Sequence, residues 1–377
     1  MFLILLMLVF FMSFPSTKTS SREEELRGVF VSYIEIEEYF KDKEENNSKK
    51  MVLSMIHQIK SIGCNTIILQ VRPCSDAMYY SNIFPISTYL SSNGEYPYDF
   101  LEYFIEETHK ENMKLIAWIN PYRIQTISNK SLISENHPAY PYLDSDIVFE
   151  KDGLYYNPSR DEVLNLIVEG VKEVLDYSID GLLFDDYFYP SSDIDLEEYH
   201  YYTKNMSISL EDYHLMIINQ MIKKVHEECQ KKKIRFGVSP EGNIENNYKN
   251  NYADVITWLK EKEYVDFIMP QIYYGFENGV KPFYDTSLEW IDLIKNDNID
   301  YYVALAFYKV GKTDYYAKKG KDEWINHSDI IMREIIASRF FQHYKGFSLF
   351  RYDDLFDQNH FTNNSQEELN NLKKILK

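Results

Sequence analysis

Short apolar runs of the kind that form buried strands alternate with amphipathic helical stretches from one end of the chain to the other. This alternation is typical of a parallel sheet, because each helix carries the chain back across the sheet to the start of the next strand. Strands are expected at residues 28–35, 65–71, 114–119, 181–185, 235–239, 266–272, 301–306 and 346–350. Helices are expected at residues 49–62, 98–112, 160–177, 209–232, 250–263, 286–296, 328–344 and 366–376.

Eight strands and eight helices predict an α/β fold, a single closed (β/α)8 TIM barrel that occupies residues 22–377. A doubly wound open sheet is the rival, but that fold would need a glycine-rich phosphate turn after an early strand, and the sequence has none. Long segments follow the second, third and fourth expected strands, whereas the returns from helix to strand are short. We therefore expect long loops, and the functional site, at the carboxyl-terminal face of the barrel.

The net charge of −19 at neutral pH makes nucleic acid an unexpected partner, since no basic stripe with interleaved aromatic residues offsets it. Residues 1–14 are apolar apart from Ser13, and a polar stretch follows. We interpret residues 1–21 as an export signal or a retained N-terminal membrane anchor, although a buried core helix is the alternative. A secreted or cell-envelope location, with possible membrane attachment, is the corresponding expectation.

The segment 179–190 carries the sharpest chemical signal, because an apolar strand ends abruptly in Asp185 and Asp186. An unpaired buried carboxylate is costly, so these side chains should face an opening filled by solvent or ligand. Side chains alternate along a strand, and both aspartates cannot point into the barrel. If Leu183 faces inward, Asp185 does too, and Asp186 turns toward the loop.

Glycoside cleavage needs two carboxyl groups, about 5 Å apart for retention or roughly 6.5–9.5 Å apart for inversion of the anomeric centre. We therefore predict Asp185 as the nucleophile or base, with Asp186 as the second choice for this role. Glu241, one strand over, is the expected general acid, and Asp76, Glu35 and Asp353 are the alternatives.

Polar or aromatic residues stand at the carboxyl end of every expected strand. A cup of carboxylates, amides, arginines and tyrosines suits a neutral polyhydroxylated ligand better than a phosphate, which calls for clustered basic residues or a glycine loop. The expected substrate-binding residues are Tyr33, Glu35, Arg72, Asp76, Asn120, Tyr122, Arg123, Tyr187, Tyr189, Gln271, Tyr273, Tyr274, Tyr308 and Tyr352.

No cofactor is expected. The nine histidines form no His-x-His or His-x-x-x-His pair, and the three cysteines lack zinc-ligand spacing, so a transition metal is not indicated. A hard cation held by Asp185, Asp186 or the pair Asp353 and Asp354 stays open.

Six ordered segments of the chain resemble the bacterial glycosyl-hydrolase-like family ten, a TIM-barrel family. They are residues 27–33, 70–79, 117–123, 180–190, 237–240 and 270–273, with the sequences RGVFVSY, QVRPCSDAMY, AWINPYR, DGLLFDDYFYP, GVSP and PQIY. The resemblance spans about residues 26–356 and implies a secreted or envelope-attached enzyme that acts on glycan strands. The resemblance also implies peptidoglycan as the leading substrate class, particularly glycan strands that lack stem peptides. Glu241 and Leu183 depart from residues common in the family.

We therefore predict a glycoside hydrolase that cleaves a cell-wall polysaccharide without an organic cofactor. A noncatalytic glycan-binding barrel of the cell envelope is the first alternative, because a fold can host either role. A metal-dependent hydrolase or deacetylase is the second. The sequence leaves the sugar linkage, the anomeric outcome and the oligomeric state open.

Overall fold

A computed structural model describes residues 24–185, 188–204 and 206–376 of the chain. The expected leader at residues 1–21 lies outside this range, as do Asp186 and Tyr187. Among the described residues, no helix combines the length and the apolar character that a membrane crossing requires.

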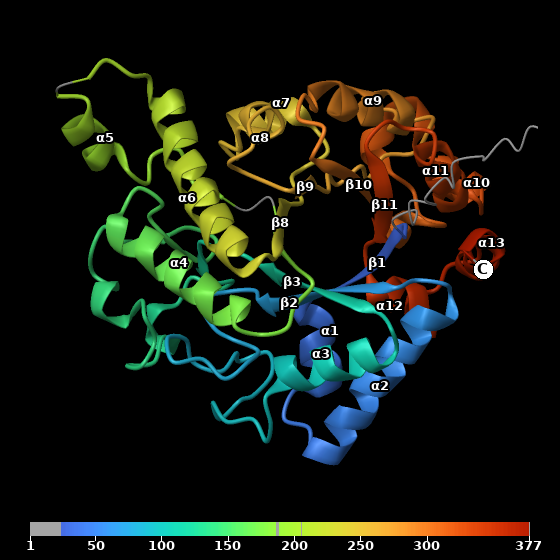
Figure 1. Cartoon of the computed structure of the whole chain (residues 1–377), viewed down its shortest axis with the longest axis horizontal. Coiled ribbons are helices and arrows are strands. Elements are labelled where there is room, and N and C mark those ends of the chain that lie inside the picture. The colour runs from blue at the N-terminus through green and yellow to red at the C-terminus, as the bar shows by residue number, and fades with distance from the viewer. Residues whose placement is uncertain (1–23, 186–187, 205, 377) are drawn as a thin grey trace, which may run out of the picture.

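Eight parallel strands close into a barrel in the order β1-β2-β3-β7-β8-β9-β10-β11, with β11 pairing back to β1 (Figure 1). The TIM barrel predicted from the sequence is confirmed. The barrel strands are β1 Leu26–Val31, β2 Thr66–Arg72, β3 Lys114–Ile119, β7 Gly181–Phe184, β8 Arg235–Val238, β9 Phe267–Ile268, β10 Asp300–Leu305 and β11 Tyr344–Leu349. Gln271 extends the short β9 through bridges to Glu241 and Ala304.

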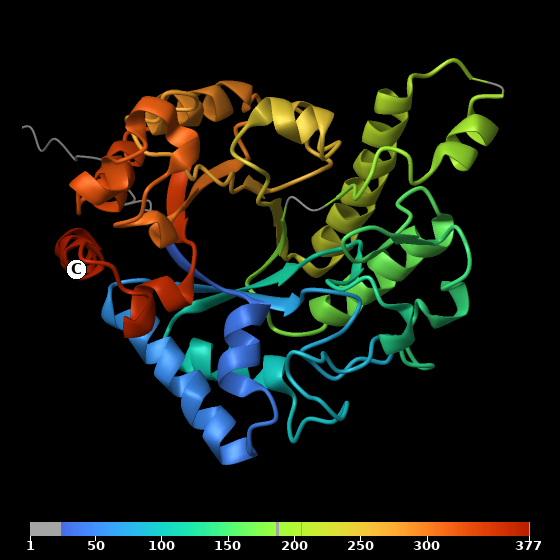
Figure 2. The same cartoon turned by 180° about the vertical axis from the view of Figure 1, so that it is seen from behind.

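Helices surround the barrel on its outside (Figures 1 and 2). Their bounds are α1 Tyr33–Phe40, α2 Glu45–Ser61, α3 Phe100–Lys110, α4 Asp161–Leu175, α5 Leu196–Tyr202, α6 Leu210–Lys232, α7 Ile244–Lys249, α8 Val255–Trp258, α9 Phe283–Leu293, α10 Glu323–Asn326, α11 Ile330–Ser338, α12 Tyr352–Phe356 and α13 Ser365–Leu376.

Several predicted elements differ in the structure. The strand expected at residues 266–272 forms only at residues 267–268, and the helix expected at residues 328–344 ends at Ser338. The first strand was expected to continue to Glu35, but it ends at Val31 because Ser32 caps helix α1 and forms a reciprocal capping box with Glu35. The helix expected at residues 250–263 forms only as the short helix α8, and α7 ends before it, at Lys249. Tyr252 has a positive φ of 52°, and Asp254 starts α8 by accepting a hydrogen bond from the Thr257 backbone, so the chain turns between them.

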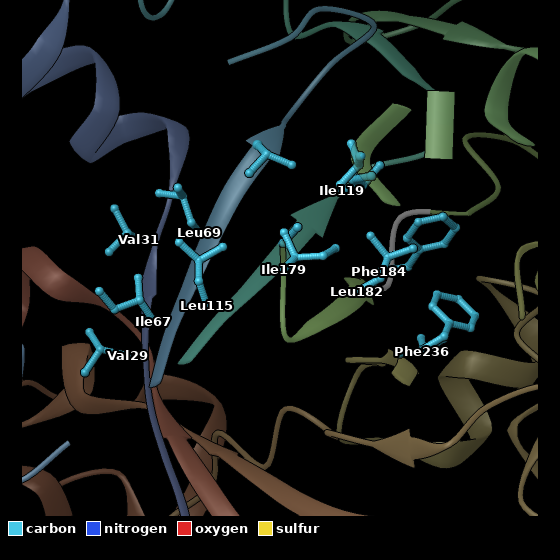
Figure 3. Close-up of a cluster of buried hydrophobic side chains, with 14 of the residues drawn as sticks. Val29, Val31, Ile67, Leu69, Leu115, Ile119, Ile179, Leu182, Phe184 and Phe236 are labelled. Atoms are coloured by element: carbon cyan, nitrogen blue, oxygen red, sulfur yellow. The ribbon is translucent and has the colours of Figure 1, made fainter. Parts of the chain in front are cut away.

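Alternation along the strands divides the apolar side chains into two layers. Phe30, Ile68, Ile116 and Leu183 belong to the cluster inside the barrel. Their neighbours along the strands pack outward against the helices. Figure 3 shows outward-facing side chains that include Val29, Val31, Ile67, Leu69, Leu115, Ile119, Leu182 and Phe184. Burying each such side chain contributes roughly 1.5–3 kcal/mol, which fixes the strand register and therefore the direction of every residue at the strand ends.

The long loops lie at the carboxyl ends of the early strands, as predicted. Residues 73–99 connect β2 to α3. A small antiparallel sheet follows β3 in the strand order β4-β6-β5, built from β4 Arg123–Gln125, β5 Val148–Glu150 and β6 Leu154–Tyr156. Helix α5 and the start of α6 stand out from the barrel after β7 (Figure 1).

Candidate active site

A cavity of about 600 Å³ opens at the carboxyl-terminal face of the barrel. Every barrel strand, or the loop directly after it, contributes to its wall. The wall consists of Phe30, Ser32, Tyr33, Ile34, Gln70, Trp118, Arg123, Asp185, Ser239, Gln271, Tyr273, Tyr308, Lys312, Phe350, Arg351, Asp354 and His360. We call this space the main cavity.

Asp185 lies at the floor of the main cavity and is 4% exposed. It stands two residues after the inward-facing Leu183, so strand alternation directs it into the barrel. Its Oδ2 accepts hydrogen bonds from Trp118 Nε1 at 3.1 Å and from Asn120 Nδ2 at 2.5 Å. These two N–H donors stabilise negative charge on the carboxylate.

A line of amides fixes the direction of the Asn120 donor. The Tyr33 backbone N–H donates to Gln70 Oε1 at 3.0 Å, and Gln70 Nε2 donates to Asn120 Oδ1 at 2.5 Å. Because an amide has one acceptor end and one donor end, the acceptor end of Asn120 faces Gln70 and its NH2 group faces Asp185. The carboxylate therefore sits in a hydrogen-bond network assembled from the ends of β2, β3 and β7.

Aromatic rings form one side of the main cavity. Phe30 contacts Trp118 and Phe350 edge to face, with ring centroids 5.4 and 5.6 Å apart. The rings of Tyr273 and Tyr308 meet edge to face at 5.8 Å. Burial raises the pKa of Tyr308 to about 12, so its hydroxyl is neutral at physiological pH. Aromatic faces beside neutral hydroxyls match the apolar faces and hydroxyl groups of sugars.

Charged groups form another side. Arg351 Nη1 bonds Glu35 Oε1 at 2.6 Å, and Lys312 Nζ lies 3.4 Å from Asp354 Oδ1. His360 Nδ1 stands 3.9 Å from the same Asp354 oxygen. Among the described residues, Asp185 and Asp354 are the carboxylates on the cavity wall.

Glu35, a predicted substrate-binding residue, does not reach the main cavity. It is fully buried, where it caps α1 through Ser32 and supports Arg351 from behind. Burial, and to a lesser extent the negative charge of Glu35, raises the pKa of the neighbouring Asp353 carboxyl to about 7. Glu35 therefore positions Arg351, which does line the cavity.

Glu241, the predicted general acid, is half-buried and lies off the cavity wall. Its Oε1 accepts a hydrogen bond from Asn246 Nδ2 at 2.7 Å, which holds it toward α7. The structure therefore does not bring Glu241 and Asp185 together on one surface. Asp186 and Tyr187, also predicted site residues, lie outside the described residues.

The other predicted substrate-binding residues fall into three groups. Tyr33, Arg123, Gln271, Tyr273 and Tyr308 line the main cavity. Asp76 lines a second cavity. Arg72, Asn120, Tyr122, Tyr189 and Tyr352 are buried behind the walls, and Tyr274 is half-buried beside Glu241.

Several buried members of this set have structural partners. Arg72 stacks on the Phe84 ring at 4.6 Å, and Tyr189 donates to Asp195 Oδ2 at 2.6 Å. The Tyr352 hydroxyl bonds Gln58.

Several residues of the cavity wall are not among the predicted site residues. Trp118 stands two residues before Asn120 and therefore shares its inward direction, a signal that was available in the sequence. Lys312 and His360 come from connecting segments whose path the sequence does not reveal. The wall residues that are not among the predicted catalytic or substrate-binding residues are Phe30, Ser32, Ile34, Gln70, Trp118, Ser239, Lys312, Phe350, Arg351, Asp354 and His360, of which Asp354 was predicted only as a possible cation ligand.

Within the part of the chain that the structure describes, no group of three or more histidine, cysteine, aspartate or glutamate side chains gathers in a way that could hold a metal ion. The cysteine thiols at 64, 74 and 229 are buried.

Solved structures with a similar fold include carbohydrate-active enzymes. The glycoside hydrolase domain of PgaB (BpsB) from Bordetella bronchiseptica aligns with a TM-score of 0.58 and 11% identity, over 93% of this chain and 99% of that domain. Alpha-L-fucosidase isoenzyme 2 from Paenibacillus thiaminolyticus aligns with a TM-score of 0.55 and 14% identity, over 93% of this chain and 49% of that one. At these identities the likeness shows the fold.

Sequence relatives are closer. Glycosyl hydrolase YngK of Bacillus subtilis (strain 168) is 31% identical, and the match covers 92% of this chain and 72% of YngK. Glycosyl hydrolase DigH of Escherichia coli (strain K12) is 29% identical, and the match covers 79% of this chain and 76% of DigH. Residues 25–325 match the family described as Glycosyl hydrolase-like 10. The chain belongs to this glycosyl hydrolase-like family, as the resemblance of its strand-end motifs predicted.

Proposed function

We propose that this protein hydrolyses glycosidic bonds in a cell-wall polysaccharide, and that its substrate is the glycan strand of peptidoglycan without stem peptides. The observation that carries the proposal is the position of Asp185, at the floor of a sugar-sized cavity, between two N–H donors and beside aromatic rings. Family membership supports the reaction class.

Asp185 acts in this proposal as the nucleophile or the base. The donors Trp118 and Asn120 stabilise its negative charge, and a fixed carboxylate below the sugar ring can stabilise an oxocarbenium-like transition state. Both donors occupy Oδ2, so the orientation of the carboxylate is set before a ligand arrives. Pre-organised charge of this kind lowers the barrier more than a mobile carboxylate does.

The second carboxyl group protonates the leaving oxygen. Asp186 adjoins Asp185 in the chain, and Glu241 lies off the wall of the main cavity, with its Oε1 bonded to Asn246. Asp354 is a further candidate because it lines the main cavity. The variants Asp186→Asn, Glu241→Gln and Asp354→Asn separate these roles. Loss of the acid slows cleavage of the natural glycan far more than cleavage of an aryl glycoside whose leaving group needs no protonation.

The substrate class is argued from charge. Arg123, Lys312 and Arg351 line the main cavity of a chain whose net charge is −19. A peptide-free peptidoglycan strand carries a free lactyl carboxylate on every second sugar, which such cationic groups can bind. A peptide on that carboxyl removes the charge and adds bulk. Export by residues 1–21, which would bring the protein to the cell wall, is part of the same proposal.

The decisive experiment incubates the protein without residues 1–21 with purified peptidoglycan, with and without prior removal of the peptides by an amidase. Mass spectrometry then measures the products. We expect glycan fragments from the peptide-free sample, and their loss in Asp185→Asn. Asp297→Asn is the matched control, since Asp297 is exposed just before β10, at the opposite end of the barrel.

A noncatalytic glycan-binding barrel is the second candidate function. It is favoured by the position of Glu241 off the cavity wall, which leaves Asp185 without the acid that the sequence predicted. Under this alternative the wild type binds peptide-free strands in a pull-down with insoluble peptidoglycan, yet releases no fragments from them. Binding with unchanged glycan in every sample would contradict the hydrolase proposal.

A further inference from the structure

A second cavity, of about 510 Å³, lies between the long loops that follow β2 and β3. These loops are tied together by the Ser75 backbone N–H, which donates to the Ile124 carbonyl at 3.4 Å, and by the hydroxyls of Tyr89 and Thr126, which are 3.0 Å apart. Both loops leave the carboxyl ends of their strands, so this second cavity opens on the same face of the barrel as the main cavity.

The two cavities share a wall of side chains. Tyr33 lines the main cavity and Tyr89 lines the second cavity, and their ring centroids are only 4.6 Å apart. The Arg123 guanidinium lies 5.7 Å from the Tyr33 ring, on the main-cavity side, and the next two residues of β4 line the second cavity. Only the thickness of the Tyr33 and Tyr89 rings therefore separates the residues that line one cavity from those that line the other.

Asp76 supplies a buried polar group at the wall of the second cavity. It is 8% exposed, and its Oδ2 accepts a hydrogen bond from Ser87 Oγ at 2.6 Å. Its Oδ1 has no hydrogen-bond partner of ordinary geometry among the described residues. A buried carboxylate oxygen without a partner costs free energy, and a donor from a ligand, such as a sugar hydroxyl, would remove that cost.

The charges of the two cavities differ. Asp76 and Glu95 line the second cavity, and no lysine or arginine of the described residues does. His137 also lines it, and burial lowers the pKa of that imidazole to about 4, so it is neutral at physiological pH. The remaining polar groups are amides and hydroxyls, among them Asn93, Gln125 and Asn136. This lining suits an uncharged, hydroxyl-rich ligand and disfavours an anion.

We infer that the second cavity is an accessory subsite for an uncharged sugar unit of the same glycan strand whose acidic sugar occupies the main cavity. The inference rests on the proposed function, because it takes the substrate to be a strand of alternating neutral and acidic sugars. The Tyr33–Tyr89 wall separates the two subsites. A strand long enough to cross it then gains contacts that a short fragment cannot make.

The test measures binding by calorimetry in the Asp185→Asn background, with peptide-free peptidoglycan fragments of two and of six sugars as probes. We expect the longer fragment to bind roughly tenfold or more tightly, as one or two added hydrogen bonds to a charged group would give. Thr88→Trp places a large ring at an exposed position of the cavity wall and should abolish this gain from length. Ser61→Trp, exposed at the end of α2 and near the opposite face, is the control that should keep it.

Asp76→Asn provides an independent variant, because asparagine has the same shape and can still accept the Ser87 hydrogen bond. It should reduce the gain from length, with an unchanged melting temperature showing that the fold is intact. If wild type cleaves peptidoglycan but Thr88→Trp and Asp76→Asn keep the full gain from length, the subsite is wrong and the hydrolase proposal stands. If wild type neither binds nor cleaves either fragment, both proposals fail.

Discussion

Replacing Asn120 by aspartate tests the network around Asp185 most directly. Asn120 is 1% exposed and donates to Asp185 Oδ2 at 2.5 Å, while its own oxygen accepts from Gln70. Aspartate has the same shape and can keep the Gln70 bond, so the fold should tolerate the change. Only the contact with Asp185 changes, from a donor–acceptor pair to two carboxylates.

The size of the expected pKa shift follows from the distance between the two carboxylate charges. Two negative charges about 4 Å apart, at an effective dielectric constant of about 20, repel by about 4 kcal/mol. Because one pKa unit corresponds to about 1.4 kcal/mol, this repulsion equals roughly three pKa units. The two carboxyl groups therefore share one proton over a wide pH range, and the higher pKa belongs to the pair. A nucleophile or base at position 185 is then partly protonated near pH 7.

The assay is the pH dependence of kcat/KM on peptide-free glycan fragments. We expect the acid limb of the Asn120→Asp profile to move upward by about one to three pH units, with lower activity at pH 6 and partial recovery toward pH 9. Asn298→Asp, exposed before β10, is the matched control and should leave the profile in place. An acid limb that stays where wild type has it, in a variant of normal melting temperature, would refute the assignment of Asp185 as the group that must be ionised.

Three further outcomes test other parts of the structure. Trp118→Phe removes the second donor to Asp185 while keeping a ring, and we expect kcat to fall roughly tenfold to a hundredfold with little change in stability, measured by steady-state kinetics and thermal melting. Gly237→Ala places a methyl group 2.3 Å from the Phe267 ring inside the barrel and should destabilise the fold by about 1–3 kcal/mol in urea unfolding. Glu334→Gln should raise the melting temperature by an amount that grows between pH 5 and pH 8. Burial, together with the charge of Glu368, raises the pKa of Glu334 well above its usual value, so the folded protein keeps a proton that the unfolded chain releases as the pH rises above about 4.5. A gain that shrinks with rising pH would contradict that sign.

The position of Asp185 was predictable from local pattern alone. Leu183 and Asp185 are two residues apart on a strand, and the apolar register that buries Leu182 and Phe184 against the helices leaves only one direction for them. The number of strands was also predictable from local pattern. The spacing of apolar residues within a window of about ten residues distinguishes a strand from a helix.

The environment of Glu35 was only half predictable. Ser32 and Glu35 have the spacing of a capping box, so a helix start at Tyr33 could have been read from the sequence in place of a longer strand. The partner of Glu35, however, is Arg351, which is 316 residues away in the chain. Contacts of that range depend on how the barrel closes, and no local pattern contains them. The contact of Glu241 was not predictable either. Its hydrogen bond from Asn246 depends on the short helix α7, which was not expected from the sequence.

The chain as a whole is strongly negative, whereas the wall of the main cavity carries Arg123, Lys312 and Arg351 beside Asp185 and Asp354. Under the proposed function, the charges on this wall and not the net charge decide whether an acidic sugar binds. A net charge of −19 argues against a polyanion that needs a broad surface, but at physiological ionic strength charges more than about 8 Å apart are largely screened. Under the proposed function, a sugar carboxylate inside the main cavity would interact instead with Arg123, Lys312 and Arg351, which line it. Binding of an acidic glycan fragment should then weaken when Lys312 is replaced by methionine, whereas charge reversal of distant surface acids should change mainly the association rate. If Lys312→Met binds the acidic fragment as wild type does, and distant reversals change its equilibrium affinity, then the net field of the protein and not the wall of the cavity selects the substrate.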